Sequence, residues 1–206
     1  MAEKGLPTLL GSEYRKDVEV NLLLKEEWMV QHGGFPIKDT IGKEEFRIEN
    51  SFNTHSVIDA YDRRILKLVR KCAAWTLTYH IYSGDTLTER RATVKLAPWK
   101  CNKVAWVYTY SPPYPTPDDP TDLSVMKPAF MMQASTCGNM IKDVEITNPD
   151  TGEVYATMNR AKAKELFPDC PKRHYALTVK SGVDYAFMTA CAVLFNSMVK
   201  QESNNN

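Results

Sequence analysis

Apolar and polar residues alternate with a period of two along much of the chain, which is typical of half-buried strands. The pattern is strongest at residues 75–82, where Trp75, Leu77, Tyr79 and Ile81 alternate with Thr, His and Tyr residues. β-Branched and aromatic residues of this kind favour strands. Further strands are expected at five other segments, namely 45–49, 91–96, 104–110, 130–133 and 175–179.

Two segments predict β-hairpins. Residues 143–158 hold two alternating arms around Asn-Pro-Asp-Thr-Gly at 148–152, which is dense turn chemistry. Residues 56–71 allow two interpretations, because their apolar positions fit one face of a helix as well as two arms around a polar turn at 59–64. We choose the hairpin, since the strand that follows at 75–82 is clear.

The C-terminal segment at 182–199 has a helical period and is apolar on almost every side. Ser181 is the expected N-cap, and Asp184 follows three residues later as a short capping box. A helix that is apolar all round needs a wall around it. Many short strands followed by one such helix predict a closed or nearly closed β-barrel threaded by that helix, which also removes exposed sheet edges.

We expect a single domain over residues 18–200, with a flexible arm at 1–17 and a disordered tail at 201–206. The 206 residues, 43% of them hydrophobic, suffice for one large core without disulfides or metals. Residues 111–128 hold six of the twelve prolines. Because proline cannot donate to a sheet ladder, this stretch predicts an exposed loop inside the domain, with a domain linker as the alternative.

The sequence predicts a cytosolic protein. The first residues contain no apolar run, and the five cysteines are widely spaced, as suits reduced thiols. As a helix, residues 182–199 would measure about 27 Å, close to the length of a membrane span. Asp184, Thr189 and Asn196 within the segment favour a buried core helix over a tail anchor.

Charge is balanced overall but uneven along the chain. The 26 Lys and Arg residues face 25 Asp and Glu residues, which excludes a uniformly basic nucleic-acid binder. Residues 56–110, however, contain ten basic and four acidic residues, a local net charge of +6, with Trp99 and Trp106 nearby. Such a face suits anionic lipid headgroups, although solvated outward strand positions would look the same. The candidate lipid-binding residues are Arg63, Arg64, Lys67, Arg90, Arg91 and Lys95.

No catalytic residue, metal site or cofactor is expected. Phosphate-binding glycine loops, zinc-protease, hydrolase and EF-hand motifs are all missing from the sequence. His80 lies opposite the apolar positions of its strand and is expected to be an exposed ring. Cys170 and His174, with Asp169, lack the second ligand pair of a structural zinc site. Cys137 has no identifiable base.

The C-terminal residues resemble a known family. The strand 175–179 and the following Ser-Gly-Val-Asp-Tyr-Ala-Phe at 181–187 resemble the closing "P-G-V-D-x-A-F" turn and buried helix of LURP-one-related proteins, with Ser181 in place of proline. The hairpin at 143–158 resembles their "D-x-x-G-x-V" hairpin. Residues 56–71 resemble an earlier "D-x-x-G-x-x-L-x-x-x-R-K" unit, in which Arg63 and Arg64 replace the glycine. The resemblance covers roughly residues 19–199.

The resemblance implies a Tubby-like fold, a twelve-stranded barrel around a central C-terminal helix. The family belongs with phospholipid scramblases and Tubby C-terminal domains; Tubby domains bind phosphoinositides, and plant LURP-one-related proteins are linked to defence. A shared fold does not transfer these roles. Calcium-activated scrambling is not expected, because the acidic stretch before the scramblase helix is replaced here by residues 168–175 with a single acid, and the cysteine-rich palmitoylation run has no counterpart.

These observations predict a non-enzymatic binding module that docks reversibly on anionic phospholipid or phosphoinositide surfaces, peripherally at the plasma membrane and without a transmembrane span. The motivation is the +6 segment together with the resemblance. The alternative is a protein-interaction module that uses the loop at 112–128, because polyproline segments dock in aromatic grooves. Scramblase-like lipid transfer and an unrecognised enzyme rank behind both.

Overall fold

The computed structural model describes residues 9–25, 34–51, 53–71, 76–97, 103–114, 123–124, 126–137, 140–171 and 174–204. Within them the chain forms a short 3-10 helix, η1 (Ser12–Tyr14), two α-helices, α1 (Arg160–Leu166) and α2 (Tyr185–Asn204), and twelve strands. The strands are β1 (Val20–Lys25), β2 (Phe35–Asp39), β3 (Glu44–Ser51), β4 (Thr54–Asp59), β5 (Arg64–Arg70), β6 (Thr78–Ser83), β7 (Arg90–Leu96), β8 (Val104–Tyr114), β9 (Phe130–Cys137), β10 (Met140–Thr147), β11 (Val154–Asn159) and β12 (His174–Val179).

All twelve strands are antiparallel and close into one barrel. Each strand from β2 to β12 pairs with its neighbour in the sequence, and β1 closes the ring by pairing with β12 from Val20 opposite Val179 to Lys25 opposite His174. The predicted closed barrel is therefore confirmed, as are the hairpins β4–β5 and β10–β11.

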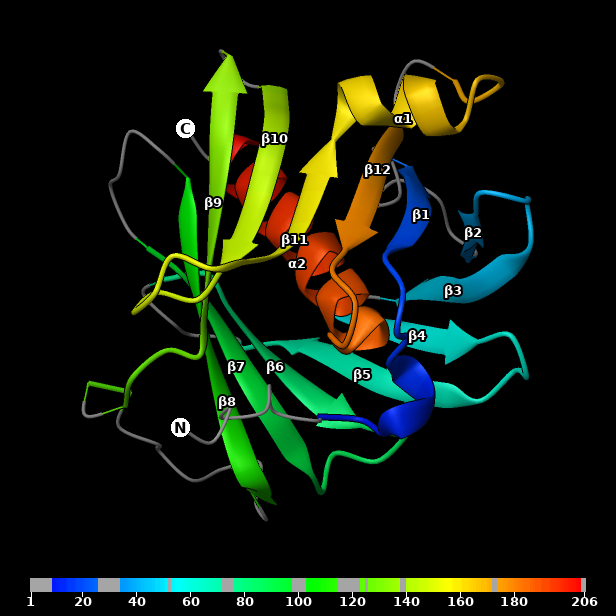
Figure 1. Ribbon diagram of the computed structural model, residues 1–206. Coiled ribbons are helices and arrows are strands. Elements are labelled where there is room, and N and C mark those ends of the chain that lie inside the picture. Colours follow the sequence, from blue (N-terminus) through cyan, green and yellow to red (C-terminus); the bar gives the residue numbers. More distant parts are fainter. Residues whose placement is uncertain are drawn as a thin grey trace.

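The helix α2 fills the barrel (Figure 1). Phe187, Leu194 and Phe195 have no exposed surface, and each contributes roughly 1.5–3 kcal/mol through burial. Two polar side chains of the helix find partners within it: Thr189 Oγ1 donates to the Tyr185 carbonyl at 2.7 Å, and Gln201 Nε2 donates to Ser197 Oγ at 3.3 Å. In the part of the chain that the structure describes, no helix combines the length and the apolar character that a membrane crossing requires.

The helix begins later than the sequence predicts, and the assignment of Ser181 as its N-cap is wrong. Gly182 adopts a left-handed φ of 76° in a turn whose N–H groups bond to the Lys16 and Lys180 carbonyls, so the chain cannot enter the helix there. Asp184 takes the capping role instead: its Oδ1 accepts from the Phe187 N–H at 2.9 Å, and its carbonyl accepts from Met188.

Both ends of the domain are more ordered than expected. The flexible arm predicted for residues 1–17 is wrong for residues 9–17, because Leu9 and Tyr14, the last residue of η1, are buried in the main core. Residues 1–8 lie outside the described residues. The disordered tail predicted at 201–206 is wrong for residues 201–204, which extend α2.

The proline-rich segment is partly a strand. Residues 111–114, including Pro112 and Pro113, belong to β8, so the predicted loop is wrong for them. The ladder between β7 and β8 shifts here: Ala92 pairs with Thr109 and Arg90 with Tyr114, which leaves both prolines in the irregular stretch where a ladder N–H is not required. Residues 115–122 and 125 lie outside the described residues.

Candidate functional site

The outer side of strands β5–β8 gathers cations and aromatic side chains, and we call it the outer basic face. Its first row starts at Lys71, directly after β5, and crosses β6, β7 and β8: Lys71 N donates to the Thr78 carbonyl at 2.9 Å, Thr78 pairs with Lys95, and Lys95 pairs with Trp106. These side chains point outward, because Ile81, Val94 and Val107 at alternate positions lie in the barrel core. The row holds two lysines, of which Lys95 lies beside the Trp106 ring.

A second row on the same face holds a buried hydrogen-bond network. His80 Nδ1 lies 3.0 Å from Thr93 Oγ1, and Thr93 Oγ1 lies 2.9 Å from the Tyr110 hydroxyl. The Arg90 guanidinium stacks 5.3 Å from the centre of the Tyr110 ring. The network forms a buried layer outside the barrel wall, since none of these residues belongs to the main core.

The expectation that His80 is an exposed ring is therefore wrong. It points out of the barrel, as the alternation predicted, but only 9% of it is exposed because outward neighbours such as Tyr82 and Tyr110 surround it. Burial, together with the positive charges of Arg90 and Lys71, lowers the pKa of His80 to about 4. The shift indicates a neutral imidazole in a positive environment.

Arg63 and Arg64, two of the six predicted lipid-binding residues, are held by carboxylates. Arg63 Nε donates to Asp59 Oδ2 at 2.7 Å, and one of its terminal nitrogens donates to the Tyr14 hydroxyl at 3.3 Å. Arg64 reaches Asp85 at 2.5 Å and Glu49 at 3.2 Å. Neither guanidinium is presented as an unneutralised charge.

The other four predicted residues lie on β5 and β7 in different environments. Arg91 donates to Ser83 Oγ at 3.2 Å and to Glu89 at 3.1 Å, and Arg90 is only 3% exposed. Lys67 Nζ donates to the Asp85 carbonyl at 3.3 Å, and Lys95 stands in the first row. The structure thus brings Arg64, Lys67 and Arg91 together around the β6–β7 turn, places Lys95 further along the face and separates Arg63 from them.

Lys71 is a residue of this face that the sequence prediction missed. Counting alternate positions along β5 from the inward Leu66 and Leu68 would have found it, because Lys67 and Lys71 fall on the same outward side. Among the described residues, no carboxylate pairs with Lys67, Lys71 or Lys95. Trp99, named beside them from the sequence, lies outside the described residues.

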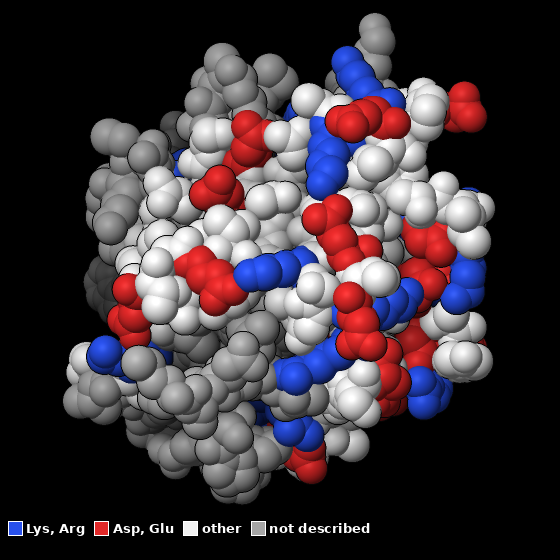
Figure 2. All heavy atoms as spheres, viewed as in Figure 1, with Lys and Arg blue, Asp and Glu red and all other residues white. Residues whose placement is uncertain are grey.

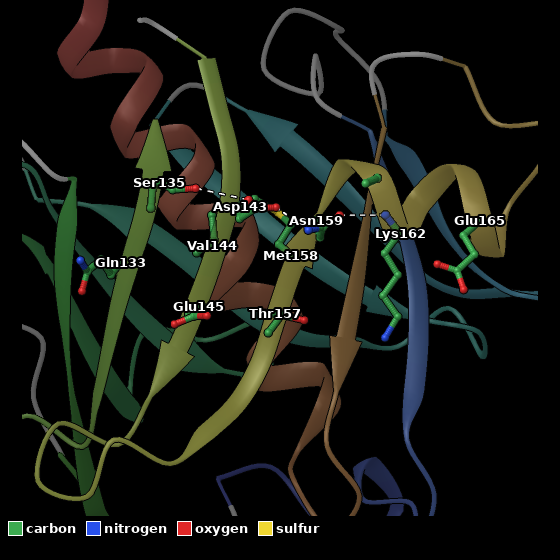
Figure 3. A pocket seen from close by; sticks show the side chains of 12 residues that line it. Gln133, Ser135, Asp143, Val144, Glu145, Thr157, Met158, Asn159, Lys162 and Glu165 are labelled. Carbon is green, nitrogen blue, oxygen red and sulfur yellow. Dashed lines mark hydrogen bonds between the residues drawn. The ribbon is translucent and has the colours of Figure 1, made fainter. Parts of the chain in front are cut away.

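A polar groove of about 760 Å³ crosses the outer side of β9–β11 and is bordered by α1 (Figure 3). One row of its floor is Ser135, Asp143 and Asn159: Ser135 Oγ donates to Asp143 Oδ2 at 3.4 Å, and Asn159 Nδ2 to Asp143 Oδ1 at 2.5 Å. The second row is Gln133, Glu145 and Thr157. Lys162 and Glu165 stand on α1, whose N-cap Asn159 accepts from the Lys162 N–H at 2.8 Å.

The chemistry of this groove disfavours anions and shows no nucleophile–base pair. Three carboxylates and one lysine stand among the described residues that line it, and within that set the hydroxyl of Ser135 meets a carboxylate without an imidazole. Figure 2, which views this side of the molecule, shows acidic and basic side chains interspersed. An anionic lipid surface is therefore better matched by the outer basic face than by the groove.

The sequence candidates for metal binding are engaged with backbone carbonyls. Cys170 Sγ lies 3.5 Å from the Ala163 carbonyl, and His174 Nδ1 lies 3.2 Å from the Pro171 carbonyl. Within the described ranges, no three His, Cys, Asp or Glu side chains gather as a metal site would require. The side chain of Cys137 lies outside the part that is described.

Comparison with known proteins identifies the family. The family model of LURP-one-related proteins matches residues 20–196, which span β1 to most of α2. The chain belongs to the LURP-one-related family. An X-ray structure of a protein from Arabidopsis thaliana is similar in fold, with a TM-score of 0.63 and 15% identity over 92% of this chain and 97% of that one. No curated protein sequence matches the chain.

The two hairpins of this chain that resemble LURP-one-related units, β4–β5 and β10–β11, differ in the residue that takes the left-handed conformation in the turn. In the β10–β11 hairpin, Gly152 takes the left-handed conformation, with a φ of 73°. In the β4–β5 hairpin the left-handed residue is Asp62, with a φ of 62°, and its carboxylate pairs with Arg47. The missing glycine of this unit is therefore accommodated at Asp62, while Arg63 and Arg64 occupy ordinary backbone conformations.

Proposed function

We propose that this LURP-one-related protein is a non-enzymatic, cytoplasmic module that docks reversibly on anionic phospholipid surfaces through the outer basic face. The observation that carries the proposal is the set of outward lysines, Lys67, Lys71 and Lys95, none of which forms an ion pair with a described carboxylate, although Lys67 feels the charge of Asp85, which Arg64 already engages. Trp106 lies on the same face and offers an amphipathic ring to the interface.

The size of the electrostatic attraction suits a reversible contact. Each cation near an anionic membrane contributes about 1 kcal/mol, so three lysines contribute about 3 kcal/mol. Arg63, Arg64 and Arg91 contribute less than the sequence suggested, because their carboxylate partners lie within 3.2 Å and cancel most of the charge. Phosphoinositides, with several phosphate charges on one headgroup, strengthen such a contact.

Flotation of the full chain with liposomes tests this proposal. Vesicles of phosphatidylcholine alone are compared with vesicles containing phosphatidylserine or phosphatidylinositol 4,5-bisphosphate. We expect recovery only with the anionic vesicles and a loss of binding as salt rises, because screening shortens the reach of the charges. The triple substitution Lys67→Gln, Lys71→Gln and Lys95→Gln is expected to weaken partitioning by about a hundredfold.

The matched control removes the same number of charges elsewhere. Lys38, Lys164 and Lys180 are exposed outside the outer basic face, the first two without an ion pair to a described carboxylate, and their replacement by Gln is expected to leave partitioning close to that of the wild type. Equal recovery on neutral and anionic vesicles, or equal loss in the two triple variants, would contradict docking through the outer basic face.

A further inference from the structure

Two neighbouring hairpin turns at one end of the barrel are built alike. One joins β2 to β3 at residues 39–43, and the other joins β4 to β5 at residues 59–63. They are neighbours because β3 and β4 pair, with Phe46 opposite Asp59, and both project to the right in Figure 1. We call these two segments the twin turns.

The first residue of each twin turn is an aspartate that bonds to the backbone donors of the turn. Asp39 Oδ1 accepts from the Ile41 N–H at 3.0 Å and from the Lys43 N–H at 2.9 Å. Asp59 Oδ1 accepts from the third and fifth residues of its own turn at the same two distances. The fourth residue is left-handed in both turns, and its N–H donates to the carbonyl of the first. The last three N–H groups of each turn are therefore satisfied without water.

The third residue of each twin turn is a large hydrophobic side chain in contact with solvent. Ile41 is 85% exposed and Tyr61 is 82% exposed, more than any other large hydrophobic side chain among the described residues. The Arg63 guanidinium lies 5.4 Å from the centre of the Tyr61 ring but leaves most of the ring uncovered. Single exposed apolar residues are common on protein surfaces, whereas these two occupy the same position of neighbouring turns.

The turn between β10 and β11 shows that this architecture does not require an apolar residue at its tip. Asn148 there takes the place of the aspartate, and its Oδ1 accepts from the Asp150 N–H at 2.8 Å. Asp150 thus stands at the position of Ile41 and Tyr61, and its side chain is 68% exposed. Turn geometry alone therefore does not account for the two hydrophobic tips.

The charged side chains of the twin turns are largely neutralised. Lys43 pairs with Glu45 at 3.0 Å, and Arg63 pairs with Asp59 at 2.6 Å. The carboxylate of Asp62 is held by an arginine of β3. The tips therefore offer apolar surface, whose removal from water is favourable, rather than an electrostatic attraction.

We infer that the twin turns insert Ile41 and Tyr61 into the boundary between the headgroups and the acyl chains of a phospholipid membrane. A tip whose backbone donors are already bonded enters a region poor in water at low cost. Tyrosine favours this boundary, because its ring lies in the apolar layer while its hydroxyl stays hydrated. Two separate protruding tips suit a deformable lipid layer, whereas a protein partner would need a pocket for each.

Insertion rests on the proposed function for bringing the chain to a membrane, and it adds a contact of a different kind. The second twin turn leads into β5, the first strand of the outer basic face, so the two contacts adjoin. The lysines of that face attract lipid through charge, which salt screens. Ile41 and Tyr61 act through burial of apolar surface, which salt does not screen. Experiment can therefore separate the two contacts.

Penetration of the full chain into a phosphatidylcholine monolayer tests the inference, because a neutral lipid leaves the outer basic face without its partner. The measured quantity is the maximum insertion pressure, the initial surface pressure above which the chain no longer enters. We expect Ile41→Ser and Tyr61→Ser each to lower it, and the double variant to lower it furthest. On vesicles containing phosphatidylserine, each substitution is expected to weaken partitioning by about tenfold at every salt concentration.

Two controls accompany these variants. Ile41→Leu combined with Tyr61→Trp keeps both tips apolar and is expected to insert like the wild type. Val154→Ser removes a partly exposed apolar side chain at the β10–β11 hairpin, and it should leave both measurements unchanged. Unchanged thermal unfolding, which we expect because the replaced tips are mostly exposed, confirms that each variant keeps its barrel.

Equal insertion pressures of the wild type and the double Ser variant would overturn the inference, whatever flotation shows. If that equality accompanies a concentration-dependent dimer that the double variant loses, the tips contact a second copy of the chain instead. Absence of flotation with anionic vesicles would contradict docking through the outer basic face, while a lowered insertion pressure of the double variant would still support the twin turns. The two proposals therefore fail by different measurements.

Discussion

Asp184 combines a structural role with an unfavourable environment for its charge. It caps α2, accepts from the Leu10 N–H at 3.1 Å and lies almost entirely inside the protein. Burial raises the pKa of Asp184 to about 6, against the lowering effect of the Phe187 and Leu10 hydrogen bonds. The folded state therefore favours the protonated carboxyl, whereas the unfolded chain ionises near the ordinary value of 3.8.

The pH dependence of unfolding follows from this shift. The stabilisation from protonated Asp184 is fully present below about pH 4 and is lost as the pH rises through 6, a change of about 3 kcal/mol. The substitution Asp184→Asn removes the titration and keeps an acceptor for the Phe187 N–H. We expect the stability of the wild type relative to this variant, measured by urea unfolding, to decrease between pH 4 and pH 6.5.

Comparison with the variant cancels the other titrating groups. Burial lowers the pKa values of His55 and His80 to about 4, so the unfolded chain takes up their protons first as the pH falls below 6.5. These two histidines therefore lower the stability of the fold with falling pH, whereas Asp184 lowers it with rising pH. They act equally in both proteins. A constant stability difference across the pH range would show that Asp184 ionises normally in the folded state.

The sequence did not reveal which carboxylates pair with the basic residues of the candidate site. The basic residues themselves could be counted, but Arg64 and Asp85 are 21 positions apart and meet only because β5 and β6 are neighbours. His80 faces outward as its alternation predicted, yet neighbouring strands bury it. Local patterns report the direction of a side chain; long-range pairing decides its charge balance and its exposure.

At the scale of elements, the segment around η1 closes one end of the barrel. Tyr14 contacts the rings of Phe46 and Tyr185, and its hydroxyl donates to Asp59 at 3.1 Å. The segment is tied to the start of α2 twice, through Leu10 to Asp184 and through the Gly182 N–H to the Lys16 carbonyl at 2.8 Å. The element therefore depends on the barrel for its order.

The substitution Tyr14→Ala is expected to detach this segment. Truncation of a buried aromatic residue costs about 3–5 kcal/mol when its site cannot collapse. Hydrogen exchange of the Leu10 and Gly182 amides should accelerate more than that of amides in β4 and β5, because local opening exposes only the segment and its partner turn. The control Tyr61→Ala removes a ring that is 82% exposed and should leave both amides protected.

An equal acceleration throughout the barrel in the Tyr14→Ala protein would mean that η1 does not open as a separate unit.

Strands and hairpins were predictable because alternation over five or more residues is a strong signal. The segment around η1 and the helix α1 were not, since pieces this short repeat no period and are ordered by tertiary contacts. The start of α2 was misplaced because Ser181 has the right chemistry but precedes a left-handed glycine.

At the scale of the whole molecule, one helix serves as the shared core of twelve strands. α2 is buried on all sides from Ala186 to Met198, and the family match spans both the barrel and most of this helix. The arrangement was predictable in outline, because a helix that is apolar all round requires a surrounding wall. It also makes the stability of the barrel depend on packing at a single element.

Leu194→Ala tests this dependence. Leu194 has no exposed surface, so the substitution should lower the free energy of unfolding by about 2–5 kcal/mol, through lost burial and the cavity left behind. Leu87 is 40% exposed, and Leu87→Ala should change stability by less than about 0.5 kcal/mol. Because every strand borders the same core, tryptophan fluorescence and far-UV circular dichroism should report one coincident transition in both variants. Separate transitions in the Leu194→Ala protein, or a loss no larger than that of Leu87→Ala, would mean that the barrel wall is stable without its central helix.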